Sequence, residues 1–155
     1  MKIAGIFFNT KLEKLVIDGL MSLPEHIVPT MYSADEVGRS SAKELGNGEF
    51  LEFKKKCTTG YFLYSVNATY DISLSEKGKS SVFMEIGEEQ PQEDVLQFVK
   101  TLSKVGIEFG FAAENKEYMH RNRHHCVLSN NRIETWVGRE LDKYCLLYTS
   151  DAADE

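Results

Sequence analysis

The sequence predicts an α+β protein, a two-layer sandwich in which two or three helices cover one face of a mostly antiparallel sheet. Two observations predict this class. Residues 69–87 alternate apolar and polar side chains on both sides of a turn at residues 76–79, which indicates a β-hairpin with one solvent-facing side. Residues 91–105 instead repeat apolar side chains at helical spacing, from Pro91 at the start to Gly106 just past the end. No linker or internal repeat interrupts the chain, so we expect a single domain over residues 1–144.

The first unit is predicted to be a strand followed by a helix. Residues 2–8 form a short apolar run that is typical of a buried strand. Thr10 and Glu13 have the spacing of a capping box, in which each side chain bonds the other residue's backbone N–H. The apolar face of the helix after them is expected to consist of Leu12, Leu15, Val16, Leu20 and Leu23.

The middle of the chain is predicted to be less regular. Residues 24–48 contain two prolines and three glycines among polar residues, so we expect mostly loop, with one turn of helix near residues 34–37. Phe50, Phe53 and Cys57 recur at helical spacing and predict a short helix that Gly60 ends.

The last third is predicted to return to strands. Residues 107–111 alternate as a strand, while residues 112–122 are charged and predict a loop or a short helix. Residues 126–129 and 132–137 predict a second hairpin around an Asn-Asn pair, which tolerates positive φ. Residues 138–144 begin another helix or a connection.

The final eleven residues, 145–155, resemble the translation of a transposon-end adaptor used to prepare sequencing libraries. We therefore expect the natural sequence to break at Tyr144, and we leave residues 145–155 out of the fold prediction, as is done for tags and fusion scars. The formal charge is −6, and it becomes −3 without the three acids of this segment, Asp151, Asp154 and Glu155. Such mild acidity disfavours nucleic acid as a partner and permits a basic protein.

The expected localisation is inferred from membrane-span, signal-peptide and cysteine patterns in the sequence. No apolar run approaches the roughly 18 residues of a membrane span, and the N-terminal apolar stretch ends at Asn9, too soon for a signal peptide. Cys57 and Cys126 are expected to be reduced thiols. Nucleotide-binding motifs such as GxGxxG or GxxxxGK[ST] do not occur. We therefore expect a cytoplasmic protein without membrane contact and without a cofactor.

A histidine cluster offers one chemical possibility. His120 and His124 lie four residues apart, a spacing that places two imidazoles on one side of a helix, and His125 comes directly after them. Zinc needs three or four converging ligands, and no acidic ligand accompanies these residues, which favours a polar basic loop over a metal site. Arg121 and Arg123 make that loop positive, so it could contact a phosphate or a carboxylate.

The single tryptophan offers a second possibility. In the predicted strand 132–137, apolar side chains occupy one face and Trp136 lies on the other beside Glu134. A tryptophan on a polar face is often an interaction anchor. A helix or further chain residues could equally cover it.

Residues 117–123 (Glu-Tyr-Met-His-Arg-Asn-Arg) and 136–144 (Trp-Val-Gly-Arg-Glu-Leu-Asp-Lys-Tyr) together resemble the C-terminal half of small α+β immunity proteins from bacterial polymorphic-toxin systems, of the immunity protein 52 type. The resemblance implies a cytoplasmic protein that binds and blocks a cognate toxin without catalysis. It also implies a last strand beyond Tyr144. From exposure and chemistry, we expect the partner-binding residues to be Glu134, Trp136, Arg139, Arg121 and Arg123.

Two other functions remain open. The chain could be a small metal-binding or hydrolytic enzyme that uses His120, His124 and His125. It could also be a structural or regulatory protein of a mobile element.

Overall fold

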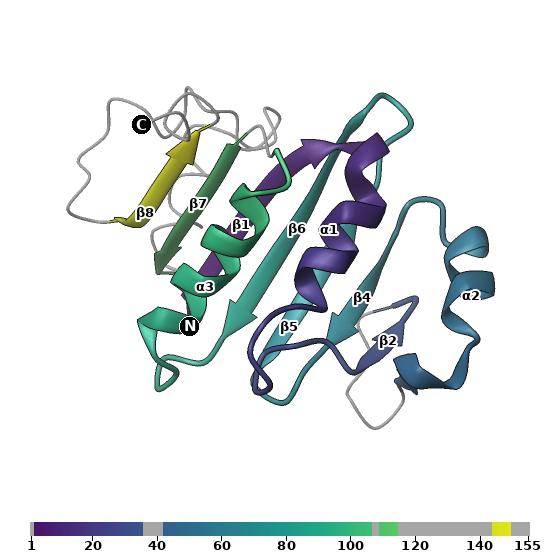
Figure 1. The fold of residues 1–155 in the computed structure, drawn as a ribbon, viewed down its shortest axis with the longest axis horizontal. Coiled ribbons are helices and arrows are strands. Elements are labelled where there is room, and N and C mark those ends of the chain that lie inside the picture. The colour runs from purple at the N-terminus through teal and green to yellow at the C-terminus, as the bar shows by residue number, and fades with distance from the viewer. Residues whose placement is uncertain (1, 36–41, 107–108, 115–143, 150–155) are drawn as a thin grey trace.

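The computed structural model describes residues 2–35, 42–106, 109–114 and 144–149, and these residues form one antiparallel sheet covered by helices (Figure 1). The strand order is β3-β2-β4-β5-β6-β1-β7-β8. The strands are β1 (Lys2–Asn9), β2 (Met31–Ser33), β3 (Lys43–Glu44), β4 (Gly60–Tyr64), β5 (Ala68–Ser73), β6 (Lys79–Ile86), β7 (Phe109–Glu114) and β8 (Tyr144–Thr149). The helices are α1 (Glu13–Leu20), α2 (Phe50–Lys56) and α3 (Gln92–Ser103), with short 3-10 turns η1 (Thr10–Leu12) and η3 (Leu45–Asn47).

The helices lie on one face of the sheet, which confirms the predicted α+β class. Figure 1 shows α1 and α3 side by side on the same side of the strands. Helix α3 contacts β1, β7 and α1. At the other end of the sheet, α2 packs its aromatic rings on β2 and β4, with the Phe53 and Tyr32 ring centroids 4.6 Å apart.

Strand β1 is an interior strand of the sheet, in agreement with its apolar sequence. It pairs antiparallel with β6 on one side and with β7 on the other. Ala4, Ile6 and Phe8 are fully buried, and the first two lie opposite Met84 and Val82 of β6. The core built around them also contains these buried residues: Val16, Ile17, Leu20, Leu23, Ile27, Tyr32, Tyr61, Leu63, Tyr70, Ile72, Val95, Phe98, Val99 and Leu102.

The hairpin of β5 and β6 and the helix α3 match their predictions. Tyr70 and Ile72 are buried, whereas Ser73 is exposed, as the alternation predicts. Gly78 has a φ of 92° in the turn, a conformation that glycine adopts without strain. Pro91 is the N-cap of α3, whose buried residues include Val95, Phe98, Val99 and Leu102.

The start of α1 differs from its prediction. The side chain of Asn9, not that of Thr10, accepts a hydrogen bond from the backbone N–H of Lys11. Thr10 donates instead to the carbonyl oxygen of Ser75, 2.8 Å away, so the capping box is wrong. Within α1 the buried residues are Val16, Ile17 and Leu20, so the face that packs on the core differs from the predicted one. Leu15 is 52% exposed, and Ile17 lies in the core instead.

The middle segment contains more strand than predicted. The expectation of mostly loop over residues 24–48 is wrong at β2 and β3, which are only three and two residues long. Strand β4 lies outside the predicted hairpin and adds to it. Ala34 and Asp35 form a bend where a helical turn was expected, and residues 36–37 lie outside the described residues. The short helix ending before Gly60 is confirmed as α2.

The last third is described in part. Strand β7 extends to Glu114, so the loop or helix predicted from residue 112 is wrong there, and Ala112 is fully buried. The predicted second hairpin at residues 126–137 lies outside the described residues. Strand β8 pairs antiparallel with β7, from Phe109 opposite Thr149 to Ala113 opposite Tyr144. Strand pairing uses main-chain groups, so this placement does not depend on the origin of residues 145–149.

Candidate functional site

The residues predicted to bind a partner lie outside the described part of the chain. Glu134, Trp136, Arg139, Arg121 and Arg123 all fall within residues 115–143, as do the three histidines of the predicted cluster. Among the residues that the structure describes, no group of three or more His, Cys, Asp or Glu side chains could hold a metal ion.

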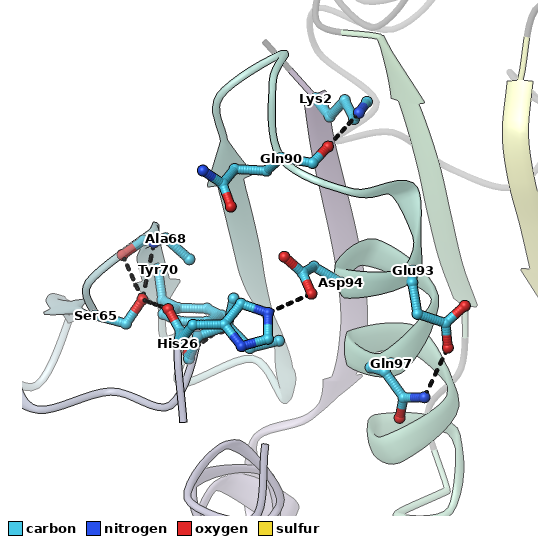
Figure 2. Close-up of polar contacts among 10 residues, drawn as sticks. Lys2, His26, Ser65, Ala68, Tyr70, Gln90, Glu93, Asp94 and Gln97 are labelled. Atoms are coloured by element: carbon cyan, nitrogen blue, oxygen red, sulfur yellow. Dashed lines mark hydrogen bonds and ion pairs between the residues drawn. The ribbon is translucent and has the colours of Figure 1, made fainter. Parts of the chain in front are cut away.

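The described residues instead bring together His26 and Asp94, which lie 68 positions apart in the sequence (Figure 2). Nε2 of His26 lies 2.6 Å from Oδ1 of Asp94. The His26 side chain is 44% exposed, whereas that of Asp94 is only 5% exposed. The pair therefore joins a solvent-facing imidazole to a carboxylate in the interior.

Main-chain bonds hold His26 in place from the sheet side. Its carbonyl oxygen accepts a hydrogen bond from the backbone N–H of Asn67, 3.1 Å away in the turn between β4 and β5. The Tyr70 hydroxyl donates to the carbonyl oxygen of the next residue, Ile27, at 2.6 Å. Ile27 is itself fully buried, so the segment that carries His26 is anchored in the core.

Asp94 is positioned by the first turn of α3. Its backbone N–H bonds to the carbonyl oxygen of Pro91, and the free N–H groups at the start of a helix favour a negative charge there. Its second oxygen, Oδ2, is buried and has no hydrogen-bond partner among the described residues. A buried carboxylate oxygen without a donor is costly, so the hydrogen bond from His26 is the main polar compensation for this group.

The negative charge of Asp94 affects the pKa of Tyr70. Burial raises the pKa of its phenol, and the Asp94 carboxylate raises it further, because a second negative charge beside the first is unfavourable. Tyr70 therefore stays protonated and serves as a hydrogen-bond donor to Ile27.

The chemistry available to the pair is set by the tautomer of the imidazole. A neutral ring that donates its Nε2 proton to Asp94 carries a lone pair on Nδ1. Ser65 does not complete a Ser-His-Asp triad, because its Oγ accepts from the backbone N–H of Ala68 at 2.8 Å and donates to the Ala68 carbonyl oxygen at 3.2 Å (Figure 2). The geometry therefore provides an oriented imidazole, and no hydroxyl of the described residues forms a hydrogen bond to its ring.

A second polar cluster has a structural role. Glu13 at the start of α1 accepts a hydrogen bond from the Tyr61 hydroxyl and pairs with Lys54 of α2. The Lys54 ammonium also lies 5.9 Å from the centre of the Phe50 ring. These contacts attach α2 to α1 and β4.

The sequence contains no local signal for the His26–Asp94 pair. Asp94 in the first turn of a predicted helix is accounted for by the helix dipole alone, and His26 lies in a segment predicted to be loop. The tertiary contact between α3 and the segment before β2 brings the two side chains together.

Comparisons with known proteins do not decide between functions: no protein-family model matches the chain, and no curated protein or solved structure matches it either. In the described residues, none of the helices has the length and apolar character needed to cross a bilayer.

Proposed function

We propose that this chain is an immunity-type binding protein that neutralises a cognate bacterial toxin by direct protein–protein contact, without catalysis. The observation that carries the proposal is the resemblance of residues 117–123 and 136–144 to the immunity protein 52 type. The α+β sandwich agrees with the fold that this resemblance implies. The excess of acidic residues suits a basic partner, because complementary charge speeds association.

The proposed contact residues are Trp136, Arg139, Glu134, Arg121 and Arg123. Tryptophan and arginine are enriched among the residues that dominate binding energy, since each offers a large rigid surface together with a polar group. As a toxin inhibitor, the protein would act in the cytoplasm of the cell that makes it, before the toxin reaches its target.

The first experiment is a long sequencing read across this locus, through Tyr144 and at least one gene on each side. The proposal expects a large secreted toxin gene directly upstream and a reading frame that continues past Tyr144 into a further strand. A read that shows residues 145–155 to be natural would contradict the adaptor interpretation. Unrelated metabolic genes on both sides would contradict the function.

The second experiment measures binding of the upstream toxin domain by calorimetry, together with rescue of bacterial growth on co-expression. Trp136→Ala is expected to weaken binding at least about tenfold, the scale of a hot-spot residue. Leu51→Ala is the control, because Leu51 is 69% exposed on α2 and lies outside the proposed contact set. Equal affinities for the two variants would argue against the contact set, and absence of binding by the unmodified chain would argue against the function.

The zinc content of the purified chain distinguishes the binding proposal from the metal-enzyme alternative. The binding proposal expects the purified chain to retain no stoichiometric Zn²⁺. Retention that is lost in the His120→Gln/His124→Gln variant would favour the enzyme instead.

A further inference from the structure

His26 has the features of a nucleophilic side chain. Its Nε2 is 2.6 Å from a carboxylate that is almost completely buried, and its ring is 44% exposed. Among the described residues, no hydrogen bond to Nδ1 is formed. A carboxylate that holds one ring nitrogen fixes the tautomer and makes the other nitrogen the available electron-pair donor.

Asp94 can also stabilise the charge that a reaction would create. When Nδ1 forms a bond to an electrophile, the imidazole becomes a cation, and the Asp94 carboxylate lies beside it in a poorly solvated position. Electrostatic interactions are stronger there than in water. Its second oxygen, Oδ2, is not engaged by another described donor.

The surrounding charges select the class of electrophile. Oδ1 of Asp94 lies 2.6 Å from the imidazole, whereas the neighbouring Glu93 accepts a hydrogen bond from Gln97 on α3 (Figure 2). The negative charge of Asp94 beside the ring disfavours an anionic donor such as a phosphoryl compound. An uncharged acyl donor meets no such repulsion.

We propose that His26 is a catalytic nucleophile toward neutral activated acyl donors, with Asp94 as its positioning residue. The Nδ1 lone pair attacks the carbonyl carbon, the bond from that carbon to the leaving oxygen breaks, and the leaving group departs as an anion. The product is an acylimidazolium paired with Asp94. Water then attacks the acyl carbon, the C–N bond breaks with its electron pair returning to Nδ1, and the carboxylic acid, the free imidazole and one proton, which passes to solvent, are released. This activity goes beyond toxin binding and does not depend on it.

The test uses the full chain with p-nitrophenyl acetate as the acyl donor and the release of p-nitrophenolate as the signal. At neutral pH we expect a rate about tenfold above that of an equal concentration of N-acetylhistidine, which lacks the buried carboxylate partner. Peptide mapping after a short reaction should find a hydroxylamine-sensitive acetyl group on His26. Lysine acetylation, in contrast, resists hydroxylamine.

Three variants locate the activity. His26→Gln should lose the excess rate, whereas His120→Gln/His124→Gln/His125→Gln should retain it. Asp94→Asn should lower the rate about tenfold, since the amide oxygen still accepts from Nε2–H but carries no charge. ¹⁵N NMR of the ring should show the Nε2-protonated tautomer in both the unmodified chain and Asp94→Asn, which separates loss of charge from loss of orientation.

The proposal is overturned by a rate no higher than that of N-acetylhistidine, by an excess that survives His26→Gln, or by an acetyl group on another histidine. If a variant fails to fold, the rate and the peptide map of the unmodified chain still decide. Toxin binding by the same preparation is read separately, so failure of the acyl-transfer reaction leaves the proposed function standing.

Discussion

The hydroxyl of Tyr61 on β4 donates a hydrogen bond to Oε2 of Glu13, 3.0 Å away at the start of α1. The same oxygen lies 3.5 Å from Nζ of Lys54 on α2, and both charged side chains are about four-fifths buried. One carboxylate therefore connects α1 to α2 and β4, two neighbouring elements that come much later in the sequence. Because the contact is shielded from water, it should matter more for stability than the exposed pair Lys55–Glu52.

The alkaline limit of stability should depend on two buried phenols. Burial, with a smaller contribution from Glu13, raises the pKa of Tyr61, and burial together with Asp94 raises that of Tyr70. Unfolded tyrosines lose their protons near pH 10, whereas the folded ones retain them. Above about pH 10 the unfolded state thus binds fewer protons, so the stability present below that pH is lost as the pH rises toward the folded pKa values.

Urea denaturation between neutral pH and about pH 11 checks this expectation. The midpoint should fall above about pH 10 in the unmodified chain and fall less steeply in Tyr61→Phe and Tyr70→Phe. At neutral pH each Phe variant should itself be less stable by about 1 kcal/mol, the net value of one hydrogen bond. Identical alkaline slopes for all three proteins would contradict the assignment.

Gly60 should tolerate no side chain. Its φ is +144°, and a Cβ there would lie 2.2 Å from the carbonyl oxygen of Ile72, which is backbone of the paired strand β5 and cannot rotate away. Gly60→Ala should lower the free energy of unfolding by more than about 2 kcal/mol. Gly46→Ala is the matched control, because a Cβ at Gly46 meets nothing within 4 Å. A Gly60→Ala protein as stable as the control would refute the strained geometry.

The two leucines of α1 should behave differently although the sequence pattern places them on one face. Leu20 is fully buried, so Leu20→Ala should cost about 2–5 kcal/mol through lost burial and the cavity it leaves. Leu15 is 52% exposed, and Leu15→Ala should change the stability by less than about 0.5 kcal/mol. Thermal and urea unfolding of both variants measure the difference. Equal costs would mean that the helix is rotated relative to the structure.

Pairing of β8 with β7 can be tested through the backbone. Successive backbone N–H groups of a strand point to opposite sides. In an antiparallel pair, the N–H of either Leu146 or Leu147 therefore points toward β7. Leu146→Pro/Leu147→Pro should lower the free energy of unfolding by about 1–3 kcal/mol, since a carbonyl of β7 loses its donor. The double alanine variant keeps both N–H groups and serves as control. Equal stability of the two variants would show that β8 contributes nothing.

The chemistry of the molecule was less predictable than its fold, for a physical reason. The resemblance at Trp136 and the histidine cluster depend on runs of adjacent residues, which a sequence shows directly, although these residues lie outside the described part. The His26–Asp94 pair depends on a contact across 68 positions, and neither partner has an unusual neighbour that marks it.

Local periodicity determined the hairpin of β5 and β6, the helix α3 and the buried strand β1, because each is long enough for its apolar pattern to identify it. Tertiary structure decided the rest. The three-residue strand β2 pairs with β4, and the two-residue strand β3 pairs with β2 in turn, so neither is long enough to be identified without its partner. The exposure of Leu15 depends on which side of α1 packs on the core. The charge of Asp94 can remain in the interior because packing brings an imidazole from a distant loop to it, and no pattern of neighbouring residues encodes that distance.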